Sequence, residues 1–230
     1  MKAVSRRFTD RAAAGIALAR ALQRQVLEPP LLVLGLPRGG VAVAYEVARM
    51  LEAPLDVMLV RKIGMPGQPE LAIGAIAPGN IIVHEPRAAR DIRGLDDTFE
   101  RLVETERREL ERREQLFRAG LAALELQGRT VILVDDGMAT GSTMLAALRA
   151  ARKADATAIV AAAPVASAEA IELIRAEADS VVIVQVPAVL FAIGEWYEHF
   201  EQLEDTEVSR LLALARQGGR NPPGERPRTQ

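Results

Sequence analysis

Cysteine is absent from this chain of 230 residues. Its absence excludes disulfides, zinc–thiolate sites and cysteine nucleophiles, and it fits a protein of the reducing cytoplasm. Aromatic residues are scarce, at 3%, and the 29 basic and 31 acidic residues leave a formal net charge of −2. A chain with few stacking side chains and no net positive charge is a poor candidate for nucleic-acid binding. Any site for an anion must therefore be local.

Long hydrophobic runs are missing as well. A membrane-spanning helix needs about 20 consecutive apolar residues, and the richest stretch, residues 156–168, is interrupted by Pro164 and Ser167. The first 15 residues are charged and lack the apolar centre of a secretory signal peptide. These features predict a soluble, cytoplasmic protein without a membrane partner. The hydrophobic content of 49% is sufficient for a substantial core.

Short apolar runs rich in β-branched residues alternate with longer helical patterns along the chain. This alternation predicts an α/β fold with a mostly parallel central sheet flanked by helices. The expected strands are residues 31–36, 55–60, 130–134, 157–163 and 180–186, with a hairpin at 73–76 and 81–83. The expected helices are residues 9–25, 39–51, 97–126, 142–152, 169–177 and 206–216. Residues 218–230 are polar and rich in Gly and Pro, so we expect a disordered tail there.

The expected helix at 97–126 is heavily charged, and its apolar residues fall seven positions apart. They are Val103, Leu110, Phe117 and Leu124. Such a narrow stripe favours a solvated helix lying on a sheet over a coiled coil, because Glu106 and Arg113 occupy the intervening core positions. The sequence offers no function for this helix.

The segment Val131–Met144, VILVDDGMATGSTM, carries the clearest chemistry. A buried strand ends at two carboxylates, Asp135 and Asp136, at the edge of the sheet where ligands bind in open α/β folds. A loop of Gly, Ser and Thr follows and leads into a helix whose first N–H groups can hold a phosphate. The carboxylates would repel that phosphate, so they must accept sugar hydroxyls or hold a divalent cation. A phosphorylated ribose meets both requirements.

Two other interpretations of these residues remain open. A strand followed by two acids and a glycine turn also occurs where an ordinary turn caps a helix, and in the acidic pocket of a receiver domain. A Walker phosphate loop is excluded, because no lysine follows Gly141.

The segment resembles the signature of type I phosphoribosyltransferases that binds 5-phosphoribosyl-1-pyrophosphate (PRPP). The resemblance implies their Rossmann-like fold: a single domain at 1–217 with its core at about 25–190, a small hood from the N-terminal segment and 190–217, and a mobile loop. It implies that Asp135 and Asp136 hold the ribose 2′- and 3′-hydroxyls and, indirectly, Mg²⁺. The implied 5′-phosphate residues are Gly137, Met138, Ala139, Thr140, Gly141, Ser142 and Thr143.

Two further segments resemble the pyrophosphate-binding parts of that family. Arg38, Gly39 and Gly40 follow the first expected strand, where glycine lets backbone N–H groups approach a diphosphate. Arg61 and Lys62 end the second expected strand and resemble the basic pair of orotate-type members. Lysine occurs at only three positions, and Lys62 joins the acid pair as a candidate catalytic residue. A helix-opening turn and a solvated strand end are the alternatives.

The acceptor of the ribose is less well defined. Family members that act on 6-oxopurines carry an aspartate at the position of Ala139, so this substrate class is disfavoured. The stretch at 64–70 corresponds to a mobile loop that closes over the reacting centre and excludes water. It contains Glu70, a candidate for proton transfer. Phe191 and Trp196 follow the last strand and are candidates for stacking on a base, with core packing as the alternative.

The resemblance thus implies a Mg²⁺-dependent transferase of nucleotide metabolism or salvage. It would move 5-phosphoribosyl from PRPP to a nucleobase-like acceptor, release pyrophosphate, and assemble as a homodimer as many members do. The alternative is a catalytically silent protein that binds PRPP or a nucleotide for regulation on the same fold. The sequence contains no DNA-reading helix or basic patch, which disfavours a repressor role.

Overall fold

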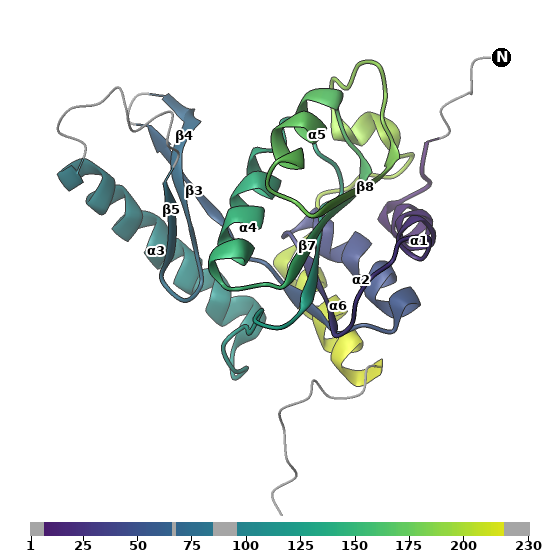
Figure 1. Ribbon diagram of the computed structural model, residues 1–230, viewed down its shortest axis with the longest axis horizontal. Helices are drawn as coiled ribbons and strands as arrows, with labels where there is room; N and C mark the ends of the chain where they lie inside the picture. The colour runs from purple at the N-terminus through teal and green to yellow at the C-terminus, as the bar shows by residue number, and fades with distance from the viewer. Residues whose placement is uncertain (1–6, 66–67, 85–95, 219–230) are drawn as a thin grey trace, which may run out of the picture.

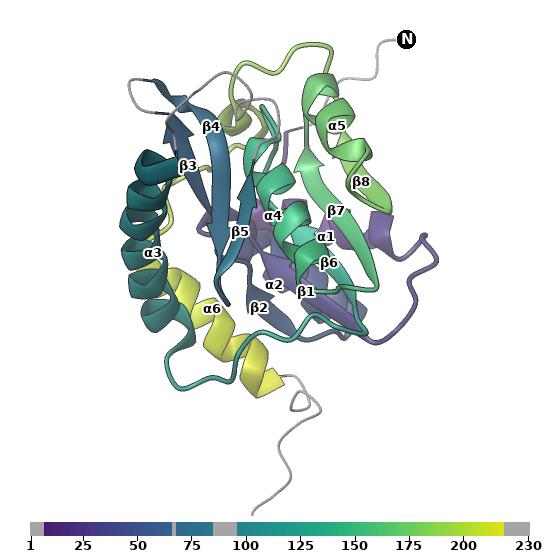
Figure 2. The ribbon, with the colours of Figure 1, turned by 60° about the vertical axis from the view of Figure 1, so that its left-hand side comes forward.

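The structure is a computed structural model that describes residues 7–65, 68–84 and 96–218, without the side chains of residues 68–72, 96–98 and 218 (Figure 1). This part of the chain contains a five-stranded parallel sheet and a three-stranded antiparallel sheet. Helices cover both faces of the larger sheet (Figure 1 and Figure 2). The expected α/β fold with a mostly parallel central sheet is therefore confirmed.

The parallel sheet has the strand order β2-β1-β6-β7-β8. Its strands are β1 (Leu31–Gly35), β2 (Leu55–Val57), β6 (Thr130–Val134), β7 (Ala158–Val165) and β8 (Ser180–Gln185). A strand covered by helices on both sides must be apolar on both faces, and every residue of β6 is buried. The continuous aliphatic run at 131–134 is what allows β6 to lie in the middle of the sheet.

Two groups of helices cover the two faces of this sheet, and each group has its own apolar core. The helices are α1 (Arg11–Leu22), α2 (Gly39–Leu51) and α6 (Asp205–Gly218) on one face, and α4 (Ser142–Lys153) and α5 (Ala168–Arg175) on the other. Val33 and Ile132 belong to the first core, whereas Leu34 and Leu133 belong to the second. Successive side chains of a strand point to opposite faces, so each strand contributes to both cores.

The antiparallel sheet lies beside this core and carries the long charged helix. It consists of β3 (Arg61–Met65), β4 (Gln68–Ala77) and β5 (Ile81–His84), with helix α3 (Asp96–Arg118) packed on it (Figure 2). The pairing of β4 with β5 confirms the expected hairpin. At Gly74 a Cβ atom would lie 3.0 Å from the ring of Phe99, so the absence of a side chain allows α3 to approach the sheet closely.

The sequence prediction for residues 58–70 is wrong. The expected second strand was to end at Arg61 and Lys62, but β2 ends at Val57 and these two basic residues begin β3. The expected loop at 64–70 is also largely strand, and residues 66 and 67 lie outside the described part. The register of β3 against β4 shifts twice near Gly64. These irregularities remove the alternation of side chains by which a strand is recognised in sequence.

Helix α3 is shorter than expected, because it ends at Arg118 and not near residue 126. Gly120 has a φ of +75°, in the left-handed region where a helix terminates. Val103, Leu110 and Phe117 are buried in the core, as the predicted apolar stripe requires. The helix is thus an amphipathic element of the domain, in agreement with the interpretation favoured from its sequence.

A buried ion pair holds the end of α3 against β2. Arg118 Nε and Nη2 donate to the two carboxylate oxygens of Asp56, each at 3.1 Å. Only 5% of the Arg118 side chain and 16% of the Asp56 side chain are exposed. Arg118 also donates to the carbonyl of Ala122 at 2.9 Å. The planar guanidinium therefore satisfies a carboxylate and a carbonyl at once.

The remaining elements differ from prediction only at their ends. Helix α6 extends to Gly218, and the rest of the expected tail, residues 219–230, lies outside the described residues. Within the described part of the chain, no helix has both the length and the hydropathy needed to cross a membrane.

Replacing Arg118 with alanine should lower the free energy of unfolding by about 3 kcal/mol or more, because the Asp56 carboxylate is left buried without its partner. Urea unfolding followed by circular dichroism measures this loss. Arg112→Ala is the control, since Arg112 is 57% exposed on the same helix and an exposed ion pair contributes about 0.2–1 kcal/mol. Equal losses in the two variants would contradict the role of Arg118.

Candidate functional site

The chain diverges to opposite faces of the sheet after two neighbouring strands. The segment after β1 leads into α2 on one face, and the segment after β6 leads into α4 on the other. β1 and β6 pair with each other along their whole length. In open α/β sheets such a point of divergence, at the carboxyl ends of the strands, is where ligands bind. Two predicted motifs, residues 38–40 after β1 and residues 135–143 after β6, lie at this point.

Asp135 and Asp136 follow β6, and each is fixed through one carboxylate oxygen. The Asp136 backbone N–H donates to Asp135 Oδ1 at 2.9 Å, and Arg11 Nε donates to Asp136 Oδ2 at 2.8 Å. Among the described residues, no N–H group donates to Asp135 Oδ2 or Asp136 Oδ1, and the two carboxyl groups lie close enough to interact with each other. The acid pair therefore presents two carboxylate oxygens that can accept hydrogen bonds from a ligand.

The loop after β1 lies directly against this acid pair. A Cβ atom on Gly39 would overlap the Asp136 carboxylate, and one on Gly40 would lie 2.5 Å from the carbonyl oxygen of Val134. Only glycine fits at these two positions without movement of the neighbouring chain. The Pro37–Arg38 peptide bond just before them is cis. The tertiary structure thus brings together two motifs that are almost 100 residues apart in the sequence.

The turn at residues 137–143 is anchored to β7 and α5. The Met138 N–H donates to the carbonyl of Val165 at 2.9 Å. Ser167 Oγ donates to the carbonyl of Ala139 at 2.7 Å and also caps α5 by accepting from the Ala170 N–H. One serine therefore holds the turn and begins the next helix, which fixes the turn relative to the sheet.

The turn ends at the N-terminus of α4. Gly141 has a φ of +73°, which favours glycine, and it immediately precedes the helix. The hydroxyls of Thr140 and Ser142 lie 3.1 Å apart, and Thr143 is exposed beside them. Free N–H groups, hydroxyl donors and the positive end of a helix dipole together form a suitable environment for a phosphate.

The two basic residues of β3, Arg61 and Lys62, contact different neighbours. Lys62 Nζ lies 3.3 Å from Ser142 Oγ, so Lys62 reaches the turn before α4. Arg61 Nε lies 2.8 Å from a carboxylate oxygen of Glu106 on α3. These two residues come from the antiparallel sheet, and they place positive charge beside the carboxyl edge of the parallel sheet.

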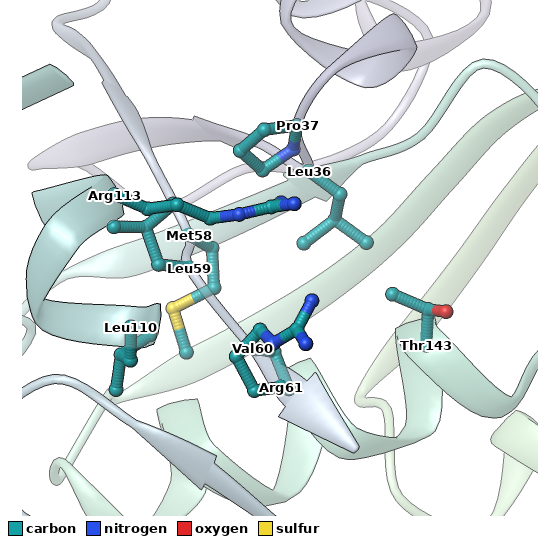
Figure 3. A pocket seen from close by; sticks show the side chains of 9 residues that line it. All are labelled: Leu36, Pro37, Met58, Leu59, Val60, Arg61, Leu110, Arg113 and Thr143. Carbon is teal, nitrogen blue, oxygen red and sulfur yellow. The ribbon is translucent and has the colours of Figure 1, made fainter. Parts of the chain in front are cut away.

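A small cavity of about 20 Å³ is lined by Pro37, from the loop after β1, and by Thr143, at the start of α4 (Figure 3). The side chains of Arg61 and Arg113 extend into the space between them. Arg113 comes from α3, where its Nε is held 3.0 Å from Glu109. The volume holds about one water molecule, so the cavity is a gap between packed elements and not a substrate pocket.

The segment after β8 covers the acid pair. Tyr197 Oη donates to the backbone carbonyl of Asp136 at 2.6 Å. Ile193, in a short 3-10 turn (Ile193–Trp196), packs so closely on Gly137 that a Cβ atom there would lie 2.5 Å from Ile193 Cγ2. The predicted hood region therefore contacts both the acid pair, through Tyr197, and the turn at residues 137–143, through Ile193.

The residues predicted to contact the base are less well placed. Trp196 packs against Phe8 and Tyr197 in a small apolar cluster, whereas Phe191 is 83% exposed. The structure thus gives Trp196 a packing role and leaves Phe191 free of this cluster. The side chain of Glu70 lies outside the described residues.

The electrostatics of the site raise the pKa of one of its acids, Asp135, and of its tyrosine, Tyr197. Burial, followed by the neighbouring Asp136 carboxylate, raises the pKa of Asp135 well above its usual range. Burial also raises the pKa of Tyr197, which therefore stays protonated and can donate to Asp136. Arg11 counters part of the charge of the acid pair from its position beside Asp136.

Two residues of this site were not predicted from the sequence, Arg11 and Tyr197. Tyr197 carries no motif of its own. Arg11 had one usable signal: it is the first residue of α1, whose first turn contains no acidic residue. A cation at the positive end of a helix is locally unfavourable, and such a conflict often marks a functional residue.

The sequence matches the family model described as phosphoribosyl transferase domain over residues 7–198. The crystal structure of TT1426 from Thermus thermophilus is 44% identical, with a TM-score of 0.82, over 90% of this chain and 97% of that one. Two Mycobacterium tuberculosis proteins, provisionally named phosphoribosyl transferases, are each 44% identical over 90% of this chain. The chain spans about half the length of these two relatives, 47%. This chain belongs to the phosphoribosyl transferase family.

Asp135→Asn should raise the free energy of unfolding at pH 7 to 8. The folded state raises the pKa of Asp135, so it binds the proton more tightly than the unfolded state. Stability is therefore lost as the pH rises from the ordinary aspartate value of about 4 through the raised one. The asparagine keeps an oxygen for the Asp136 N–H and removes the buried charge.

Urea unfolding between pH 4 and pH 8 measures this effect, with Asp155→Asn, at an exposed carboxylate, as the control. The pH dependence should be flatter in Asp135→Asn than in the control and in the unaltered protein. Lower stability of Asp135→Asn at pH 7 would show that the carboxylate is not destabilising.

Proposed function

We propose that this chain is a phosphoribosyltransferase that moves the 5-phosphoribosyl group from PRPP to a nitrogenous base and releases pyrophosphate, with Mg²⁺ bound. One observation carries the proposal: the glycine loop at 37–40, the acid pair at 135–136 and the turn at 137–143 meet at one edge of the sheet. Each of the three has the chemical character needed for one part of PRPP.

The acid pair and the turn would hold the phosphorylated sugar. Asp135 Oδ2 and Asp136 Oδ1 would accept the two ribose hydroxyls, because each carboxylate has its other oxygen engaged. The 5′-phosphate would lie at residues 137–143, against the hydroxyls of Thr140, Ser142 and Thr143 and the first N–H groups of α4. A ribose that carries both free hydroxyls and a 5′-phosphate would use the acids and the hydrogen-bond donors, which follow one another directly along the chain.

The loop after β1 would hold the pyrophosphate. The first N–H groups of α2, beginning at Gly39 and Gly40, have no partner within the helix, and Arg38 and Arg61 add positive charge. Lys62 would contribute between the two phosphate subsites, since its Nζ lies 3.3 Å from Ser142 Oγ. All of these groups stabilise negative charge, which grows on pyrophosphate as it departs.

The proposed reaction is a displacement at the anomeric carbon of the ribose. The bond from the anomeric carbon to the pyrophosphate oxygen breaks and its electron pair leaves with pyrophosphate. A nitrogen lone pair of the base forms the new bond to this carbon, and the base releases its proton to solvent. The sugar carries positive charge in the transition state, so the carboxylates of Asp135 and Asp136 stabilise it electrostatically. Positioning and electrostatics account for the catalysis on this scheme, because the protein forms no covalent bond to the sugar.

The donor set fits magnesium in a limited way. Two adjacent carboxylates supply hard oxygens, and among the described residues no group of three or more potential metal ligands is present. Mg²⁺ usually takes one or two carboxylates and completes its shell with water and substrate phosphates. Asp135 and Asp136 would hold it indirectly, because their free oxygens accept the ribose hydroxyls, and when bound it would neutralise part of the pyrophosphate charge.

The acceptor is proposed to be a nucleobase-like compound that enters beside the segment after β8. Ala139 is exposed in the turn and has no group that can accept a proton. The exposed ring of Phe191 is available for stacking on a base, whereas Trp196 packs in the apolar cluster. A 6-oxopurine that needs a carboxylate at position 139 is a poor fit to this site.

Pyrophosphate release from PRPP and Mg²⁺, measured across a panel of purine, pyrimidine and other nitrogen bases, tests the function. We expect release that depends on one class of base. PRPP binding without release for any base would instead support the regulatory protein that uses the same fold without catalysis. Absence of PRPP binding would refute both.

Asp135→Ala combined with Asp136→Ala should abolish PRPP binding in calorimetry with Mg²⁺, because both hydroxyl acceptors are lost. Gly39→Ala should weaken the affinity at least about tenfold, since its Cβ atom would displace the Asp136 carboxylate. Arg20→Ala is the control, because Arg20 is exposed on α1. Unchanged affinity in the double variant would contradict the assignment of the acid pair.

A further inference from the structure

Arg11, at the start of α1, makes three different contacts, one of them with the acid pair. Its Nε donates to Asp136 Oδ2 at 2.8 Å, and its Nη1 donates to the carbonyl of Glu201 at 2.8 Å. Its guanidinium carbon lies 3.9 Å above the ring of Phe200. Only 12% of the Arg11 side chain and 16% of the Asp136 side chain are exposed. An arginine held on three sides in this way has little freedom to move.

The position of Arg11 in its helix is unfavourable by local rules. Asp10 caps α1 by accepting the Ala13 N–H at 2.8 Å, and Arg11 is the next residue, at the positive end of the helix dipole. A cation there gains nothing from the helix. The ion pair with Asp136 is the interaction that compensates for this placement.

Backbone pairing fixes the start of α1 at the site. The Phe8 N–H donates to the carbonyl of Trp196, and the N–H groups of Glu198 and His199 donate to the carbonyls of Phe8 and Thr9, at 2.8 to 2.9 Å. These bonds join the N-terminal segment to the chain after β8. Arg11 is therefore held in place by backbone contacts that do not involve its own side chain.

The Asp136 carboxylate is confined between Arg11 and the glycine loop. A Cβ atom on Gly39 would overlap Asp136 Oδ2 and would lie 3.0 Å from Arg11 Nε. Oδ2 thus has the guanidinium and the backbone of Gly39 as close neighbours, and rotation of the carboxylate would break the hydrogen bond to Arg11. Asp136 Oδ1 then keeps one orientation.

We infer that Arg11 is a positioning residue for the sugar subsite: it holds Asp136 so that the free carboxylate oxygen of this residue is presented to a ribose hydroxyl. The inference rests on the proposed function, since it requires the acid pair to bind the sugar. The hydrogen bonds of Arg11 go to Asp136 and Glu201 and not to residues 137–143, so its effect should be confined to recognition of the sugar. It also links that recognition to the segment after β8, through Phe200 and Glu201.

Three variants separate this role from a general role in stability. Arg11→Ala removes every contact, Arg11→Lys keeps the charge and one donor, and Arg20→Ala removes an exposed arginine of the same helix as the matched control. Calorimetry with ribose 5-phosphate and, separately, with inorganic phosphate measures binding, and thermal unfolding checks that each variant is folded.

Arg11→Ala should weaken the affinity for ribose 5-phosphate at least about tenfold and leave the affinity for inorganic phosphate unchanged. Arg11→Lys should recover part of the loss, and Arg20→Ala should bind both ligands as the unaltered protein does. In steady-state assays with PRPP, Arg11→Ala should raise KM more than it lowers kcat. If Arg11→Ala does not fold, Arg11→Lys provides the comparison, with a smaller loss in the same direction.

Two results would overturn the inference while leaving the proposed function intact: equal affinity of Arg11→Ala and the unaltered protein for ribose 5-phosphate, or an equal loss of affinity for both ligands. The first would mean that Asp136 needs no orientation by Arg11, and the second that Arg11 acts on the whole site. Failure of the unaltered protein to bind ribose 5-phosphate and PRPP would instead refute the proposed function itself.

Discussion

The contact on which the site depends is the approach of the Gly39 backbone to the Asp136 carboxylate. Neighbouring parallel strands lie about 4.8 Å apart, so the segments that leave β1 and β6 start almost in contact. A side chain at position 39 or 40 would occupy the space of the acid pair or of the β6 backbone. The two glycines therefore keep the loop after β1 and the pair of acids within one small volume.

This arrangement places charge where burial makes it costly. Asp135 lies beside a second carboxylate, and its raised pKa reflects both burial and that neighbour. Arg11 and Tyr197 offset part of the cost, one through the Asp136 carboxylate and the other through its backbone carbonyl. Both come from segments outside the parallel sheet, near opposite ends of the chain. The N-terminal and C-terminal segments are thus part of the site and do more than cover the core.

Three arginines near the glycine loop share one pattern: each is held by an acid from α3 or α6. The pairs are Arg38 with Asp205, Arg61 with Glu106 and Arg113 with Glu109. Partly exposed pairs of this kind are weak, so an incoming polyanion can compete for the arginines. The charged helix α3, for which the sequence offered no function, supplies Arg113 and two of the three acids.

The sequence by itself was sufficient for the elements with strong local patterns. The aliphatic strand at 131–134, the two acids after it and the glycine-containing turn could each be recognised, because burial on both faces requires an aliphatic run and a left-handed turn residue favours glycine. The helices were placed nearly correctly, because their apolar residues recur with the period of a helix. The β3 strand and the end of α3 were misassigned, since irregular pairing with β4 and a left-handed glycine at position 120 leave weak local signals.

Only the tertiary structure decided which residues meet. Lys62 was expected beside the pyrophosphate loop, yet its Nζ donates to Ser142 Oγ at the start of α4. Arg11 and Tyr197 joined the acid pair from 125 and 61 residues away along the chain. Such contacts depend on how separate helices and strands pack, and no local pattern of residues encodes them. Residue chemistry therefore indicated which kinds of group the site contains, whereas packing determined the partners of each charged group.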